Sequence, residues 1–195
     1  TATKNITVTP VNDAPTAAPL TLSTNEDVVL SNASVLTGVS FGPANEAQTL
    51  TLLGGTQPAN GSVTYNLLLG EITYSPNLDF NGPDTFSVAI ADNSNPSLSV
   101  VRVITVNVAP LNDNPVDTGG LPAVVSVNED ILTNVDLSSV NLVDVDAGTS
   151  PVTVKLSTTL GGTLSAVNGG GVIVANSPSS AITLTGSIAD LNAYL

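Results

Sequence analysis

The sequence predicts an all-β protein built from two tandem β-sandwich modules, the second of them incomplete at its C-terminal end. Three observations predict this fold class. Two short landmarks recur about one hundred residues apart, short β-branched runs alternate with turn residues along the chain, and only one short segment has helical spacing. Repeats at a fixed spacing indicate repeated modules, and this spacing suits one small sandwich per repeat.

The two landmarks are an Asn-Asp linker and an acidic element shortly after it. Residues 11–15 (VNDAP) recur at 111–115 (LNDNP), and Asn25-Glu26-Asp27 recurs at 128–130. The offsets are 100 and 103 residues, so the two landmarks keep nearly the same separation in both copies. Two homologous modules of about one hundred residues follow from this agreement.

Alternating or β-branched runs predict strands in both modules, because clusters of Gly, Pro and Asn separate them at intervals of about ten residues. In the first module the runs are 49–53, 62–67, 71–75, 85–91 and 99–108, and in the second they are 123–127, 152–156, 172–175 and 181–185. Residues 187–194 break the pattern. Ser187 has Asp190 three positions later, and apolar residues follow at spacings of three and four, which predicts a short capped helix.

The sequence neither begins nor ends at a boundary between the expected modules. The first module continues past Tyr74 through Asp79 to a strand at 99–108, and nothing equivalent follows Leu195. Residues 1–9 instead parallel that last strand. We therefore expect residues 1–12 to be the last strand of a preceding or partner module plus a linker, 13–113 to be module 1, and 114–195 to be a truncated module 2, within a longer protein.

Composition excludes several classes of function. The chain has 195 residues, 3 basic and 16 acidic, with a net charge of −13. Such a surface repels nucleic acid and anionic membranes. The chain has neither Cys nor His, which excludes thiol catalysis, Cys-ligated zinc and histidine bases. No apolar run is long enough to span a membrane. We expect no enzymatic activity.

The acidic residues gather where a hard cation would find ligands. Ca²⁺ takes six to eight oxygens from carboxylates, amide carbonyls and backbone carbonyls. Asn112, Asp113 and Asn114 form the densest Asn-Asp cluster, beside Pro115, which limits the backbone. This pattern points to calcium at the linker.

The sequence resembles the bacterial cadherin-like repeats of large surface adhesins, over nearly its whole length. The resemblance is carried by the linkers 11–15 and 111–115, the Asn-Glu-Asp elements, and the stretches 41–46, 79–86 and 143–148. It implies two Greek-key, Ig-like sandwiches. It also implies calcium at the junction between modules and a location outside the cell or on its surface.

The resemblance further implies a ligand set for the junction between the two modules: Glu26, Asp79, Asn112, Asp113, Asn114, Asp144 and Asp146. A weaker set, Asn12, Asp13 and Asp92, would face a preceding junction. Pro10 and Pro110 stand where cadherin linkers usually have another Asp, so we expect one or two ions at the second linker. Four further acids have a simpler interpretation. Asp27 and Asp130 are expected to be solvated strand ends, Asp84 to cap a Gly-Pro turn, and Glu46 to lie free on a loop.

These observations favour a structural and adhesive module stiffened by Ca²⁺. Its partners would be neighbouring modules of the chain or copies of it, and cell-surface or matrix ligands. One alternative is a filament or sheath subunit in which residues 1–9 complete a neighbour's module by strand addition. Another is a carbohydrate-binding accessory module, although Tyr65, Tyr74, Phe80 and Phe86 are expected to fill the first core instead of binding sugars.

Overall fold

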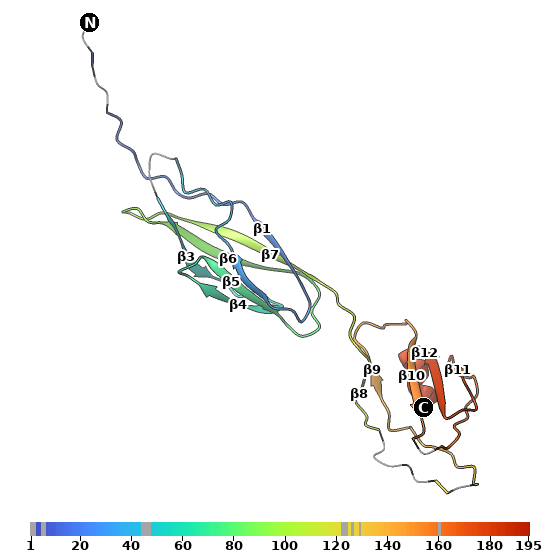
Figure 1. Ribbon diagram of the computed structural model, residues 1–195. Helices are drawn as coiled ribbons and strands as arrows, with labels where there is room; N and C mark the ends of the chain where they lie inside the picture. The colour runs from blue at the N-terminus through green and yellow to red at the C-terminus, as the bar shows by residue number, and fades with distance from the viewer. Residues whose placement is uncertain are drawn as a thin grey trace. The chain divides into compact units, whose positions relative to one another are not determined.

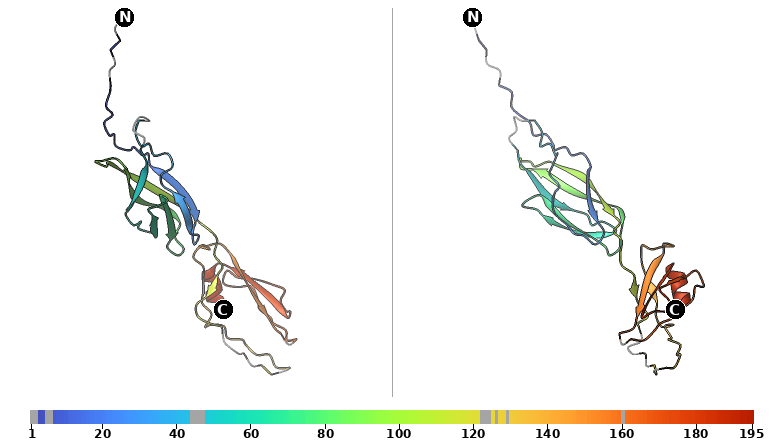
Figure 2. Two further views of the ribbon diagram at one scale, coloured as in Figure 1. Left: turned by 60° about the vertical axis from the view of Figure 1, so that its left-hand side comes forward. Right: turned by 45° about the vertical axis from the view of Figure 1, so that its right-hand side comes forward.

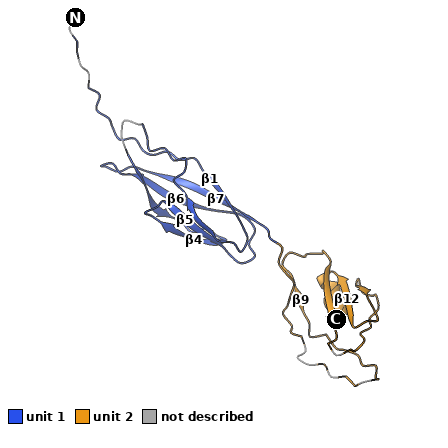
Figure 3. Ribbon diagram, viewed as in Figure 1, with its two compact units in different colours: residues 1–111 blue, residues 112–195 orange. Residues whose placement is uncertain are grey.

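A computed structural model describes residues 3–4, 7–43, 48–121, 125, 127–128, 130–159 and 161–195. The chain forms two compact units, Thr1–Leu111 and Asn112–Leu195 (Figures 1 and 3). We call them unit 1 and unit 2 and describe each by itself. The described residues of both units are mostly strands and loops with a single short helix, which confirms the all-β fold class.

Unit 1 is a sandwich of two sheets, seen from two further sides in Figure 2. Its strands are β1 (Leu20–Asn25), β2 (Leu30–Ser34), β3 (Leu50–Gly55), β4 (Gly61–Asn66), β5 (Glu71–Pro76), β6 (Gly82–Asp92) and β7 (Ser99–Ala109). One sheet has the order β1-β7-β6-β3 and the other has the order β2-β5-β4. Pairs β4–β5 and β6–β7 are antiparallel neighbours along the chain, while β2–β5 and β3–β6 pair across longer connections.

The core of unit 1 lies between the two sheets, because alternate residues of each strand point inward. Leu52, Phe86 and Ile104 from the first sheet pack in one cluster with Ile72 and Tyr74 from the second. Tyr65 and Phe80 pack against this cluster while partly exposed. The prediction that these four aromatic residues fill the first core is therefore confirmed.

The strand predictions in unit 1 were close, and the observed strands extend most of the predicted runs by one to three residues. The sequence pattern did not predict that β1 pairs in parallel with β7, from Leu20 opposite Ile104 to Asn25 opposite Ala109. A register shift between Leu52 and Gly54 marks a bulge in β3, where Gly54 has φ +113°.

The predicted role of Asp84 was wrong. Asp84 is buried, with 3% of its surface exposed, and it accepts hydrogen bonds from the Tyr74 hydroxyl (3.0 Å) and from the amides of Ala59 and Asn60 (3.3 and 3.0 Å). Only its bond from the Thr85 amide is local. Burial and the neighbouring Asp84 raise the pKa of Tyr74 well above its usual range. Asp84 therefore fixes the 59–60 loop to the core.

Unit 2 has a smaller set of elements within its described residues. They are β8 (Val116–Asp117), β9 (Leu142–Val143), β10 (Val152–Ser157), β11 (Ile173–Ala175), β12 (Ala181–Gly186) and helix α1 (Ile188–Tyr194). Strands β10, β12 and β11 form one antiparallel sheet in that order, and β8 pairs with β9. Among the described residues, unit 1 has seven strands in sheets of four and three, and unit 2 has a three-stranded sheet and a two-stranded pair.

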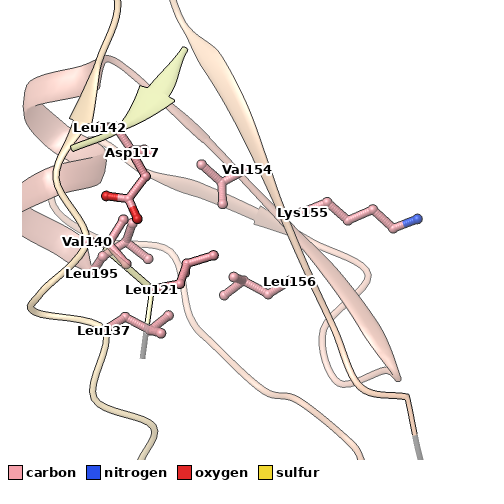
Figure 4. Close-up of a pocket in the computed structure, with 9 residues that line it drawn as sticks. All are labelled: Asp117, Leu121, Leu137, Val140, Leu142, Val154, Lys155, Leu156 and Leu195. Carbon is pink, nitrogen blue, oxygen red and sulfur yellow. The ribbon is translucent and has the colours of Figure 1, made fainter. Parts of the chain in front are cut away.

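A second core gathers under the unit 2 sheet. Val172, Ile182, Leu184 and Leu191 are buried there, and Leu191 comes from α1. Beside this core lies a largely apolar cavity of about 140 Å³, which Val140, Val154, Leu156 and Leu195 help to line (Figure 4). The helix begins as predicted, because Ser187 accepts a hydrogen bond from the Asp190 amide.

Two predicted strands differ from the structure or lie partly outside it. Of residues 123–127, only 125 and 127 are described, and neither lies in a strand. Residues 1, 2, 5 and 6 lie outside the described part, and 3–4 and 7–9 form no strand. Glu46 and Glu129 also lie outside the described residues.

Candidate metal centre

Glu26 is the central acid at one end of unit 1. It directly follows β1, and its amide donates to the Ala109 carbonyl (2.9 Å), which extends the parallel pairing with β7 by one residue. This position leaves only 1% of Glu26 exposed. One carboxylate oxygen accepts the Leu111 amide and the other accepts the Asn81 side-chain amide at 3.2 Å. Glu26 thus holds the start of the linker against the β5–β6 loop.

Asp27 and Asp79 lie beside each other next to this glutamate. Both adopt left-handed backbone conformations, with φ of 57°. Asp is among the few residues with a side chain that tolerate this conformation. The Asp79 amide donates to Asp27 Oδ1 at 3.2 Å, and carboxylate oxygens of the two residues lie within 4.8 Å of each other. Two carboxylates at this separation repel unless a cation or solvent screens them.

A second acidic group lies within unit 2. Asp144 Oδ1 accepts the amides of Asp146 (2.9 Å) and Ala147 (2.7 Å), which closes the turn after β9. Asp146 Oδ2 accepts the Asp113 amide at 2.7 Å. Residues that are 33 positions apart in the sequence are therefore in direct contact. Asn112 and Asn114 are exposed, and the Asn112 side chain donates to the Asp113 carbonyl at 2.8 Å.

A third polar group lies at the Asn12 and Asp92 positions of unit 1. The Asn12 amide donates to Asp92 Oδ2 (3.2 Å) and to the Pro96 carbonyl (3.0 Å), and Gln48 donates to Asn12 Oδ1. Burial alone would raise the pKa of Asp92. Hydrogen bonds from the Leu98 and Ser94 amides outweigh it and hold that pKa below its usual value. Asp13 is exposed.

Sequence reasoning missed some residues of these groups. Asp27 was interpreted as a solvated strand end, and it is exposed, yet its carboxylate lies beside Asp79. Its place in the repeated Asn-Glu-Asp element was the available signal. Asn81 lies in the 79–86 stretch that carries the resemblance but was not singled out, and Gln48 carried no signal, because only the fold brings them to Glu26 and Asn12.

The chemistry of the donor set fits a hard divalent cation. The groups offer carboxylate and amide oxygens with no sulfur or imidazole, which suits Ca²⁺ better than a transition metal. A buried carboxylate such as Glu26 is costly unless it is paired or hydrogen-bonded. Its two amide partners meet part of that need, and a cation beside it would stabilise its charge further.

The fold and these acidic ends define a class of protein, the β-sandwich modules with acidic residues at their ends. A family model, the bacterial cadherin-like domain, matches residues 12–110, slightly more than half of the chain. The chain therefore belongs to the bacterial cadherin-like domain family. Cadherin-like domains are typically structural or adhesive modules without enzymatic activity.

A comparison with solved structures also gave matches. Mouse cadherin-23 EC22-24 is 19% identical with a TM-score of 0.43, and the match covers 91% of this chain and 55% of that one. Protocadherin Gamma B2 extracellular cadherin domains 3-6 is 17% identical with a TM-score of 0.40, covering 91% and 44%. An endo-fucoidan hydrolase from glycoside hydrolase family 107 is 16% identical with a TM-score of 0.34, covering 93% and 25%.

This chain spans between about a quarter and just over half of the length of these structures. A search of the curated proteins found no match. Among the described residues, no helix is both long and apolar enough to cross a membrane.

Proposed function

We propose that this chain is a structural and adhesive part of a long extracellular bacterial surface protein, stiffened by Ca²⁺ where one module joins the next. The ligands would be Glu26, Asp79, Asn112, Asp113, Asn114, Asp144 and Asp146, and we add Asp27 to that set. A weaker site would involve Asn12, Asp13 and Asp92. The module boundaries at residues 13 and 113 belong to the same proposal.

One observation carries the proposal. Glu26 accepts the Leu111 amide, and Leu111 is followed by Asn112 and Asp113 along the chain. Consecutive Cα atoms are about 3.8 Å apart, so the Asp113 Cα is at most about 7.6 Å from that of Leu111. The hydrogen bond to Leu111 and the short covalent path from Leu111 to Asp113 thus keep the linker residues close to Glu26.

Within unit 2, the Asp113 amide is bound by Asp146. The linker therefore contacts Glu26 through Leu111 in unit 1 and Asp146 through Asp113 in unit 2. Each contact lies within one unit, so neither depends on how the two units are oriented. Without a cation, carboxylates this close to the linker repel one another. With Ca²⁺ their charge is neutralised, and reorientation of the modules would require breaking coordination bonds.

Thermal unfolding in Ca²⁺ and in excess chelator tests this proposal. Extracellular modules bind calcium at about 0.1 to 1 mM, so 10 mM Ca²⁺ should stabilise the protein by about 1.4 to 2.7 kcal/mol for one site. Asp27→Asn and Asp79→Asn should each reduce this gain, because each removes a negative charge while Asn still tolerates the left-handed backbone.

Asp130→Asn is the matched control. Asp130 follows the equivalent glutamate in the second Asn-Glu-Asp element and has nearly the same φ, 58°. It should retain the full calcium response. Unfolding temperatures that are identical in Ca²⁺ and in chelator would rule the proposal out, and so would equal responses of the wild type, Asp79→Asn and Asp130→Asn.

A further inference from the structure

The first and last strands of unit 1 lie side by side and run in the same direction (Figure 1). Strand β1 pairs with β7 over six consecutive positions, from Leu20 opposite Ile104 to Asn25 opposite Ala109. The chain enters β1 at its Leu20 end and leaves β7 at its Ala109 end. Entry and exit therefore lie at opposite ends of the paired stretch.

Tension along the chain would pull these two strands past each other. Force on the residues before Leu20 acts at one end of the pair, and force on the residues after Ala109 acts at the other end. In this shear geometry the hydrogen bonds between β1 and β7 carry the load together, whereas strands that are peeled apart from one end lose their bonds one after another. The pair resists tension best when the residues that enter β1 are themselves fixed to β7.

Arg102 on β7 fixes these entering residues, 16–18, which we call the entry segment. Its Nε donates a hydrogen bond to the Ala18 carbonyl at 2.7 Å. Ala18 lies two residues before Leu20, and Arg102 lies two residues before Ile104, the partner of Leu20. The Arg102 side chain thus continues the β1–β7 pairing, in the same register, beyond the position where the backbone pairing begins.

The same guanidinium also holds the loop that contacts the entry segment. One of its terminal nitrogens donates to the carbonyls of Val35 (2.7 Å) and Thr37 (2.8 Å). Further along this loop, Ser40 exchanges two backbone hydrogen bonds with Thr16 of the entry segment, at 2.8 and 2.9 Å. Arg102 therefore connects β7 to the entering chain a second time, through this loop.

The burial of Arg102 indicates that these bonds serve a purpose other than filling space. The other buried positions on the same side of β7 are Ile104, Val106 and Val108, all apolar. Arg102 is only 4% exposed, and burying a charged group is costly unless it is hydrogen-bonded. An aliphatic side chain would fill the site without that cost, but it could not hold backbone carbonyls from two separate segments.

We propose that unit 1 bears tension along the chain and that Arg102 is the latch for this function. With the entry segment fixed to β7, tension loads β1 and β7 as one pair in shear. Without the latch, the entry segment swings away from β7 and the pairs open in turn from the Leu20 end. The latch goes beyond the calcium proposal, because none of its residues belongs to the candidate metal centre.

Single-molecule pulling on the full chain tests the latch. The chain has no Cys, so Ala14→Cys and Leu111→Cys, at exposed positions before β1 and after β7, supply the two attachment points. At a fixed force in excess chelator, Arg102→Met should unfold unit 1 at least about tenfold faster than the wild type, because hydrogen bonds to a charged group are lost from the path of the load.

Ile72→Ala is the matched control, because it separates a role under tension from general destabilisation. Ile72 is 1% exposed on β5, which belongs to the other sheet and lies outside the β1–β7 pair. Truncating this core residue should lower equilibrium stability in urea about as much as Arg102→Met does. It should change the unfolding rate under tension by less than about threefold, because its contacts are still formed when β1 and β7 separate.

The direction of pulling gives a second measurement that leaves Arg102 unchanged. Ser99 begins β7 on the side of the pair where Leu20 lies, and the Asn12 side chain reaches the Pro96 carbonyl there at 3.0 Å. Attachment points at Ala14→Cys and Ser99→Cys therefore peel β1 from β7, and the pair should open at a lower force than between positions 14 and 111.

Two results would overturn the proposal. One is an equal opening force in both pulling directions, and the other is an Arg102→Met variant that unfolds under tension no faster than Ile72→Ala. Because the pulling is done in chelator, its outcome is independent of the calcium site. A missing calcium response with the latch intact would count only against the proposed metal centre.

Discussion

Arg102 is one of three basic residues in the chain, and it is buried. Its guanidinium donates to the backbone carbonyls of Ala18 (2.7 Å), Val35 (2.7 Å) and Thr37 (2.8 Å). These three carbonyls belong to two loops that flank β1 and β2. A planar guanidinium suits this task because its several donors point in fixed directions.

Replacing Arg102 should therefore destabilise unit 1. Arg102→Met keeps the apolar stem but leaves buried carbonyls without donors, and we expect a loss of about 3 kcal/mol of unfolding free energy. Urea unfolding measures this value. The same substitution at Lys155, which is exposed on β10, should change stability by less than about 0.5 kcal/mol. Equal, small effects at both positions would contradict the role assigned to Arg102.

Helix α1 ties the elements of unit 2 together. Leu191 inserts into the second core, and the Asn192 side chain both accepts from the Leu142 amide (2.8 Å) and donates to the Leu142 carbonyl (2.9 Å). Asn192 thus supplies to β9 the two backbone partners that a neighbouring strand would provide. A helix of 7 residues is too short to be stable alone, so its cap and these contacts hold it in place.

Removing the cap should destabilise unit 2. Ser187→Ala loses the acceptor for the Asp190 amide (3.1 Å) and the donor to Asp190 Oδ2 (2.7 Å), and should cost about 1 kcal/mol. Ser187→Thr retains the hydroxyl and should remain near wild-type stability. Amide hydrogen exchange of α1 detects the difference. Unchanged protection in Ser187→Ala would show that packing of Leu191 alone fixes the helix.

The sequence patterns predicted the positions of single strands and of the helix better than they predicted which strands pair. Alternation located β10 and β12 to within one residue, and the Ser187 cap located α1, since both signals depend on near neighbours. The parallel pairing of β1 with β7 and the burial of Asp84 depend on residues far apart in the sequence. For the same reason, the linker residues were recognisable from their Asn-Asp cluster, whereas the approach of Asp27 to Asp79 needed the fold.

At the scale of the whole molecule, the charged residues are unevenly distributed. The sheet faces of unit 1 carry almost no charge, while its acids gather at loops before and after the strands. The acidic residues are therefore available at the loops where one module joins the next. The proposed calcium site acts on the joint between modules.

Double electron–electron resonance between spin labels in the two units tests the central claim most directly. The chain has no Cys, so Thr64→Cys on β4 and Lys155→Cys on β10, both exposed, place one label in each unit. We expect a narrow distance distribution in 10 mM Ca²⁺ and a broad one in excess chelator. Adding Asp79→Asn should broaden the distribution in Ca²⁺. A distribution of the same width with and without Ca²⁺ would contradict the account.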